Sequence, residues 1–192
     1  MEVLRKLDID TELFELGDVI SFTLTTGEKV KARAVRETRD GMLFTTVDCL
    51  RDEMQMFKNP EEAEIVDYEH SDLRKKLQGK IFENFPKEIK EHMVPMEMGD
   101  MLRIPTEFEI FGKNEYSQKE SGSVKRFYGM EDQRNRIAFQ GSESGLWEWY
   151  WLQNKFKDST SPTTFSVVLG TGGSNCAGAE MHLAVRLVFC LA

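Results

Sequence analysis

GLWEWYWLQ, residues 145–153, carries all three tryptophans of the chain on alternate positions, Trp147, Trp149 and Trp151. Side chains that recur with a period of two lie on one face of a β-strand. Three indoles on one face can bury their large area only when that face packs against a core. The stretch therefore predicts a central packing strand with its indoles turned inward.

The composition predicts a globular protein that binds neither nucleic acid nor membranes. The 192 residues include 33 acidic and 25 basic side chains, which gives a net charge of −8, and the basic residues form no stripe. No apolar run approaches the ~20 residues that cross a bilayer, so no membrane insertion is expected. The acidic N-terminus lacks the pattern of a secretory signal. We expect a protein that is cytoplasmic at synthesis, with association with a virion left open.

The first half of the chain predicts a small sheet followed by helices. Residues 1–50 alternate apolar and polar positions around glycine-containing turns, as in an antiparallel β meander. In 70–92, Ser71 is a favourable N-cap and apolar residues follow it at helical spacing. A main helix is expected to end at Pro86, and a second short helix follows it.

The second half, 101–192, contains the tryptophan stretch and a glycine-rich region between two apolar segments. These segments, near 164–169 and 184–191, have the composition of strands. Neither a repeat nor a linker divides the chain. We therefore expect the fold class to be α+β: a single domain over 1–192, with an antiparallel sheet, one main helix and a second short helix.

No constellation of residues predicts catalysis or metal binding. The three histidines lack metal-ligand spacing, and the three cysteines contain no CxxC motif. The GTGG segment at 170–173 lacks the lysine and the helix of a phosphate loop. We expect no enzyme activity, no metal and no cofactor. A cysteine-dependent enzyme that uses Cys176 is the less favoured alternative.

The tryptophan stretch resembles a known fold family. SGLWEW, at 144–149, resembles the G-N-V-W-E-W segment of the formylglycine-generating-enzyme branch of the C-type-lectin-like fold, and AVR, at 184–186, stands where that branch has G-F-R. The resemblance implies a C-type-lectin-like domain in which Arg186 is the candidate partner of Glu148. The cysteine pair of those enzymes and the calcium-binding triplets of true C-type lectins are absent. With the strand pattern, the resemblance assigns structural roles to Trp147, Glu148, Trp149, Trp151 and Arg186.

A wider resemblance covers most of the chain. The segments HSDLRKKLQGKIFENFP, MLRIPTEFEIFG, RNRIAFQ, WYWLQN and AVRLVFCL resemble an uncharacterised domain family of Gram-positive gut bacteria and their phages. Gln153 and Leu187 depart from the Arg and Pro that are frequent there. Some members of the family look like the variable proteins of diversity-generating retroelements, in which a C-terminal segment is hypervariable. The resemblance implies a phage- or prophage-associated ligand-recognition module.

The segment 159–183 has the composition of such a variable region. Randomised adenines in Asn codons cannot produce Lys, Glu, Gln, Met or Trp, and none of these occurs from 159 to 179. An ordinary glycine-rich hairpin in a structural or carbohydrate-binding lectin-like domain is the alternative. We expect the partner to be a protein or a glycan on a cell surface, and the sequence leaves the oligomeric state open. The expected binding face consists of Val167, Leu169, Gly170, Thr171, Gly173, Asn175, Cys176, Ala177 and Gly178, with Met181, His182 and Leu183 at its edge.

Overall fold

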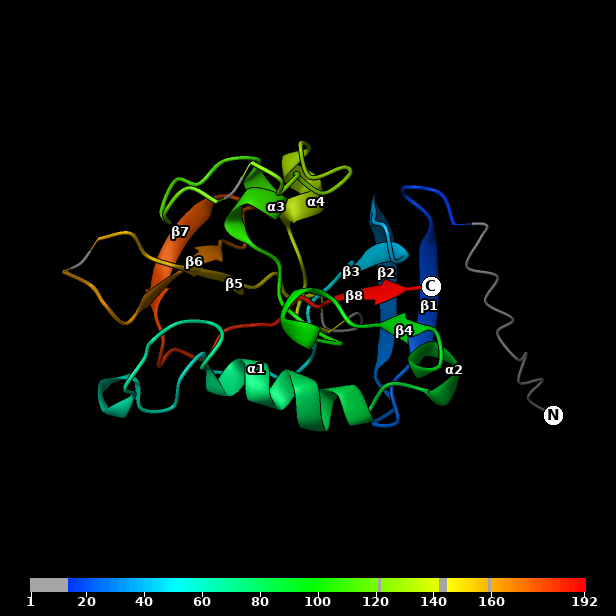
Figure 1. Cartoon of the computed structure of the whole chain (residues 1–192), viewed down its shortest axis with the longest axis horizontal. Helices are drawn as coiled ribbons and strands as arrows, with labels where there is room; N and C mark the ends of the chain where they lie inside the picture. The colour runs from blue at the N-terminus through cyan, green and yellow to red at the C-terminus, as the bar shows by residue number, and fades with distance from the viewer. Residues whose placement is uncertain (1–13, 121, 142–144, 159) are drawn as a thin grey trace.

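Two antiparallel sheets and four short α-helices form the regular structure of the computed structural model, which describes residues 14–120, 122–141, 145–158 and 160–192 (Figure 1). The strands are β1 (Val19–Thr23), β2 (Lys29–Glu37), β3 (Met42–Thr46), β4 (Met93–Val94), β5 (Tyr150–Lys155), β6 (Thr164–Val168), β7 (Ser174–Gly178) and β8 (Val188–Leu191). The helices are α1 (Asp72–Lys76), α2 (Lys87–Lys90), α3 (Glu107–Phe111) and α4 (Gln133–Arg136), with a π-helical turn η3 (Leu77–Ile81) and the 3-10 turns η2 (Pro60–Glu62) and η4 (Glu97–Gly99). The predicted α+β class is confirmed, and no helix in these residues is long and apolar enough to cross a membrane.

The larger sheet has the strand order β1-β2-β3-β8-β4. Its first three strands are the predicted N-terminal meander, in which β2 is antiparallel to both neighbours. The C-terminal strand β8 lies between β3 and β4, so that Phe44 is opposite Phe189 and Met93 is opposite Leu191. The prediction that the last strand pairs inside the sheet is confirmed, and the two ends of the described chain share one sheet.

The smaller sheet has the order β5-β6-β7 and lies at the other side of the molecule in Figure 1. The chain leaves it toward β8 through Ala184, which pairs in parallel with Tyr150. The Ala184 N–H donates to the Trp149 carbonyl at 3.0 Å, and its carbonyl accepts from the Trp151 N–H at 3.3 Å. These bonds connect β5 with the segment that leads into β8, so the two sheets are held together by the backbone.

The main helix runs beneath both sheets in Figure 1, where α1 continues directly into η3. Ser71 begins it as predicted, because its Oγ accepts from the Arg74 N–H at 3.0 Å and satisfies a donor that has no partner within the helix. Leu73 and Leu77, one turn apart, are fully buried. The amphipathic spacing therefore placed this helix correctly against the core.

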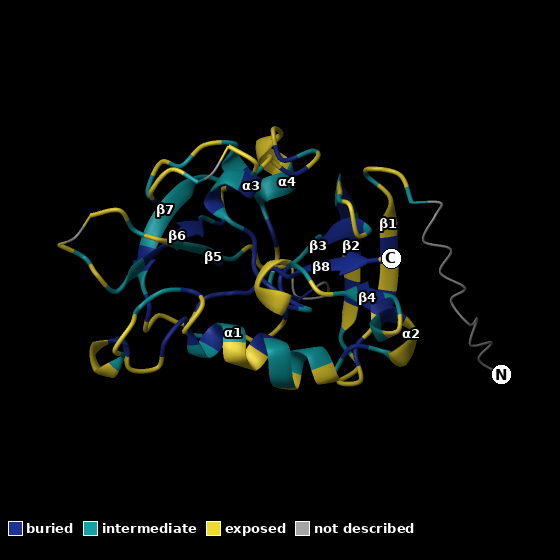
Figure 2. Cartoon of the chain, viewed as in Figure 1, coloured by how far each residue is buried: buried dark blue, intermediate teal, exposed yellow. Residues whose placement is uncertain are grey.

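The main core lies between this helix and the sheets, and Figure 2 shows the buried residues concentrated along β3 and β8. Phe22, Phe44, Phe85 and Phe189 form its aromatic centre, with the centroids of contacting rings 5.3 to 6.0 Å apart. They come from three strands of the large sheet and from the end of the main helix. Burial of these rings explains why segments distant in sequence assemble around β8.

Candidate functional site

The segment expected to form the binding face, 159–183, folds as β6, a tight turn and β7. The two strands pair antiparallel in continuous register. Gly172 in the turn has a φ of +77°, and a Cβ there would lie 2.7 Å from the Gln133 carbonyl oxygen, so the turn requires glycine. Ser159 lies outside the described residues. The local structure is therefore a glycine-rich hairpin on which the exposed side chains of the expected face are carried.

Solvent exposure divides the predicted face into three groups. The exposed residues are Thr171, Met181 and His182. The half-buried residues are Leu169, Gly173, Asn175, Cys176 and Gly178. The buried residues, which a ligand cannot reach, are Val167, Gly170, Ala177 and Leu183. The burial of these four residues disagrees with the predicted contact role, and they support the surface from below.

Trp147, predicted to lie in the core, is 56 % exposed. It precedes β5 and belongs to a short two-stranded ladder in which it is paired with Phe139. The Gln140 N–H donates to the Leu146 carbonyl on one side of this pair, and the Glu148 N–H donates to the Ala138 carbonyl on the other. The prediction of one packing strand over 145–153 is therefore wrong for residues 145–149. The chain joins the smaller sheet only at residue 150.

The ladder places two aromatic side chains together at the surface. Phe139 and Trp147 are directly opposite each other between two hydrogen-bonded pairs, so their side chains lie on the same face at the closer spacing of such positions. Phe139 is 38 % exposed. The Trp147 ring lies against Gly170 of the β6–β7 turn, where an added Cβ would come within 1.7 Å of its Cε3 atom. Phe139 and Trp147 are called the aromatic pair below, and the pair adjoins the predicted hairpin through Trp147.

The other two tryptophans lie deeper. Trp151 is fully buried, its Nε1 donates to the Met54 carbonyl at 2.7 Å, and its ring contacts Phe165 edge-on. Trp149 is half-buried against the main core. Tyr150 between them is also fully buried, in a second core cluster. The inward position of Trp151 is as predicted, but both faces of β5 are covered, which simple alternation did not predict.

Arg186 is buried, as its structural role implies, but its contacts differ from the expected pair with Glu148. Its Nε donates to the Thr46 carbonyl at 2.7 Å, and its Nη1 donates to the Asn135 carbonyl at 3.0 Å and to the Tyr150 hydroxyl at 3.2 Å. The guanidinium thereby connects β3, the end of α4 and β5. Carbonyl and hydroxyl oxygens thus take the place that the resemblance gave to a carboxylate.

Burial raises the pKa of all three cysteine thiols in the described part of the chain. No cluster of three or more His, Cys, Asp or Glu side chains there could hold a metal ion. Cys49 and Cys190 are buried, and partial burial raises the pKa of the Cys176 thiol above its ordinary value. A raised pKa reduces the thiolate fraction, whereas a nucleophilic cysteine needs a lowered one. His70 is exposed and its ring contacts Asp67 at 2.7 Å.

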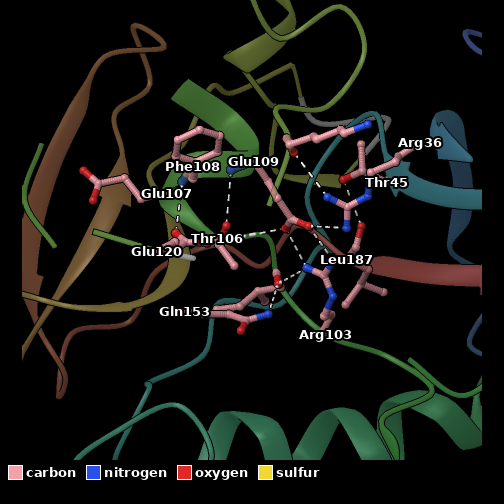
Figure 3. A network of polar contacts seen from close by, with 12 residues as sticks. Arg36, Thr45, Arg103, Thr106, Glu107, Phe108, Glu109, Glu120, Gln153 and Leu187 are labelled. Atoms are coloured by element: carbon pink, nitrogen blue, oxygen red, sulfur yellow. Dashed lines mark hydrogen bonds and ion pairs between the residues drawn. The ribbon is translucent and has the colours of Figure 1, made fainter. Parts of the chain in front are cut away.

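Figure 3 shows a buried ion-pair network that the sequence did not predict. Arg103 donates to both carboxylate oxygens of Glu109 at 2.7 Å, and Arg36 donates to one of them at 2.9 Å. Glu109 also accepts from the Thr106 N–H as part of the capping box that begins α3. Burial alone would raise the pKa of Glu109, but the two guanidinium groups outweigh it and hold the pKa below its ordinary value.

A cavity of about 670 Å³ lies against this network. Its lining includes the two arginines and Glu109 together with Lys125, Arg126 and the exposed Tyr128. Glu37 and Glu97 also line it, so charges of both signs are present and select no single class of ligand. The network is accounted for by its structural role, since it fixes α3 to β2 and to the segment that pairs with Val188.

Comparisons with known proteins do not identify the chain. No protein-family model, no curated protein and no solved structure matches it. The resemblance to C-type-lectin-like proteins therefore stays a prediction, and the function has to follow from the geometry of the surface.

Sequence reasoning missed the exposed aromatic pair, although one signal was present. The run 146–152 is apolar at every position except Glu148. A strand that is buried on one face alternates with polar residues, so this run has more apolar side chains than one inner face can hold. Leu146, 60 % exposed, and Trp147 are the residues that remain outside.

Proposed function

We propose that this chain is a non-enzymatic ligand-recognition module whose binding surface combines the aromatic pair with the β6–β7 hairpin. The observation that carries the proposal is the exposure of Trp147 while its ring is held against Gly170. Tryptophan is enriched among the side chains that dominate binding energies. An indole already fixed by a backbone contact loses little rotamer freedom when a ligand covers it.

The residues around the indole fit a contact surface better than a solvated one. The turn exposes Thr171, and β7 adds the partly exposed Asn175 and Cys176 on its two opposite faces, none of which is charged. Depletion of charge around an aromatic anchor is characteristic of the centre of an interface. A cell-surface protein or glycan is the proposed partner. Association with a phage or prophage, and variation of the hairpin sequence, rest on the resemblance to variable proteins.

The alternatives are supported less well. A cysteine-dependent enzyme needs a thiol whose pKa is lowered, whereas partial burial raises the pKa of Cys176. A structural or carbohydrate-binding lectin-like domain without variation would use the same fold. The exposed indole face is suited to stacking on a sugar ring. An experiment therefore has to distinguish a glycan ligand from a protein ligand.

Binding of the fluorescently labelled chain to a panel of intact Gram-positive gut bacteria tests the proposal. We expect saturable binding to at least one strain and a reduction of about thirtyfold in affinity for Trp147→Ala, the effect of losing about 2 kcal/mol at a hot spot. Treatment of the cells with protease removes a protein ligand, and periodate oxidation removes a glycan.

A matched control separates the anchor from general surface hydrophobicity. Ile65 is 48 % exposed and lies in a different part of the chain, so Ile65→Ala is expected to bind as the wild type does. The proposal is wrong if Trp147→Ala binds as tightly as Ile65→Ala, or if no strain in the panel is bound above the level of a denatured sample.

A further inference from the structure

The strand β7 forms a free edge of the smaller sheet, whose order is β5-β6-β7. The opposite edge, β5, is covered, because Tyr150 pairs with Ala184 and Phe156 pairs with Ser117. No strand or bridge pairs with the outer side of β7 within the described residues. An exposed strand edge carries a row of backbone donors and acceptors that another chain can use.

Two hydrogen bonds determine which backbone groups of β7 point outward. The Leu169 N–H donates to the Gly173 carbonyl, and the Ala179 N–H donates to the Thr163 carbonyl. In an antiparallel pair, hydrogen-bonded and non-hydrogen-bonded pairs alternate. The register then makes Asn175 and Ala177 the residues bonded to β6, and the outward N–H and C=O groups belong to the alternate residues, which are Ser174, Cys176 and Gly178.

Local contacts satisfy only part of this edge. The Cys176 N–H donates to the Asn175 side chain at 2.9 Å, and the Gly178 carbonyl accepts from the Met181 N–H at 3.0 Å. The N–H and C=O of Ser174, the C=O of Cys176 and the N–H of Gly178 have no hydrogen-bond partner among the residues that the structure describes. Donors and acceptors therefore remain available along the strand.

The side chains of β7 leave this edge accessible. Natural proteins protect free edges with lysine, proline or bulges, and β7 contains none of these in its sequence SNCAG or in its register with β6. Its side chains are short, so another backbone can approach to the strand spacing of about 4.8 Å. The strand also follows the turn against which Trp147 packs, so the aromatic anchor adjoins the start of this edge.

We propose that an extended segment of a partner protein adds to β7 as a fourth strand, with a basic side chain near Gly178. Strand addition supplies affinity through main-chain hydrogen bonds. Outward groups on alternate residues recur about every 7 Å, which is the repeat of an extended peptide. A glycan has no such repeat of paired donors and acceptors. The preference for a basic residue follows from Glu180, whose carboxylate lies over Gly178, and from the net charge of −8.

This inference names the partner class for the proposed function and rests on it. A displayed library of random 12-residue peptides, selected against the whole chain, provides the probe. Enriched peptides are expected to favour Lys or Arg, and methylation of alternate peptide nitrogens should abolish their binding, while methylation of the intervening nitrogens has little effect. Amide hydrogen exchange of Ser174 and Gly178 should slow at least about tenfold in the complex, whereas Asn175 and Ala177, already bonded to β6, change little.

A pair of variants at one position tests the edge directly. Ser174→Pro removes an outward N–H at the first residue of an edge strand, where proline is tolerated, and Ser174→Ala keeps that N–H while removing the hydroxyl that contacts Glu115. We expect the proline variant to bind selected peptides at least about fivefold more weakly than the alanine variant, which keeps the outward N–H. Thermal unfolding checks that both variants fold.

Three results would overturn the inference. The first is enrichment of no peptide, or binding that is insensitive to the pattern of methylation and leaves exchange at Ser174 and Gly178 unchanged. The second is equal binding by folded Ser174→Pro and Ser174→Ala. The third is a dimer of the free chain that protects β7, since a second copy would then occupy the edge. Cell binding that depends on Trp147 without protection of β7 would retain the proposed function and reject strand addition alone.

Discussion

Replacing Gly170 by alanine should displace the Trp147 ring from its position on the surface. The φ of Gly170 lies outside the left-handed region, so its backbone conformation accepts alanine. The added Cβ would nevertheless lie 1.7 Å from Cε3 and 2.4 Å from Cζ3 of the indole. Contacts this short are impossible for a rigid ring, so Trp147 has to leave the turn.

The cost follows from the part of the tryptophan that is covered. Trp147 is 56 % exposed, so roughly 110 Å² of a side chain of about 250 Å² is buried, and at about 25 cal/mol per Å² its loss costs about 2–3 kcal/mol. Urea unfolding followed by far-UV circular dichroism measures this difference. Gly173→Ala is the matched control, because its Cβ would have no neighbour nearer than 3.7 Å.

A double-mutant cycle decides whether the clash is the cause. In the Trp147→Ala background the ring is absent, so Gly170→Ala should cost less than about 0.5 kcal/mol. The reasoning is refuted if Gly170→Ala costs the same in both backgrounds, or if it is no more destabilising than Gly173→Ala. Gly170→Ala should also weaken ligand binding, because it removes the preorganisation of the anchor.

Glu109, Trp151 and Cys176 give three more predictions. Glu109→Gln leaves the Arg103 guanidinium without its charged partner and should lower the free energy of unfolding in urea by about 3–5 kcal/mol. A decrease below about 1 kcal/mol would contradict the structural role of the ion pair. Because the pKa of Glu109 lies below its ordinary value of 4.5, the carboxylate stabilises the fold fully at neutral pH, and the Tm difference between wild type and variant should shrink as the pH falls below 4.5. Trp151→Ala should cost about 3–5 kcal/mol, and an unchanged Tm would show that its burial is unimportant. Cys176 should react with a disulfide reagent no faster than glutathione, since burial raises the pKa of its thiol, and much faster reaction would favour the enzyme alternative.

The elements that the sequence predicted correctly are those determined by local chemistry. Ser71 begins the main helix because its side chain accepts a hydrogen bond from a backbone N–H three residues away. The turns of the N-terminal meander likewise depend on neighbouring residues. The position of β8 between two other strands could also be predicted, because an apolar segment without polar alternation is typical of a central strand.

The position of Trp147 could not be predicted because it depends on which segment pairs with which. Residues 147 and 151 have the same side-chain parity, but the first pairs with Phe139 and the second with Val167. Periodicity gives the orientation of a side chain relative to its own strand only. It does not identify the partner strand, and the partner decides whether a face meets the core or the solvent.

The ion-pair network was hidden for a similar reason. The spacing of Thr106 and Glu109 is that of a capping box, and this could be predicted from the sequence. Arg36, which binds the same carboxylate, is 73 residues away and reaches it only because β2 folds next to α3. Nothing in the local sequence distinguishes that arginine from others on the surface.

The fold restricts where the hairpin sequence could vary if the chain is a diversified protein. Gly170 is fixed by the Trp147 ring and Gly172 by its φ of +77° and the Gln133 carbonyl. Thr171 between them is exposed, and the outward positions of β7 are partly exposed. A near-copy of this coding region in the flanking DNA should therefore carry adenines in the codons for Thr171 and for the outward positions of β7. It should carry no adenine whose replacement would change Gly170 or Gly172. Adenines in both glycine codons would mean that substitutions are accepted where the structure leaves no space, and either the diversification hypothesis or the packing of Trp147 on this turn would have to be abandoned.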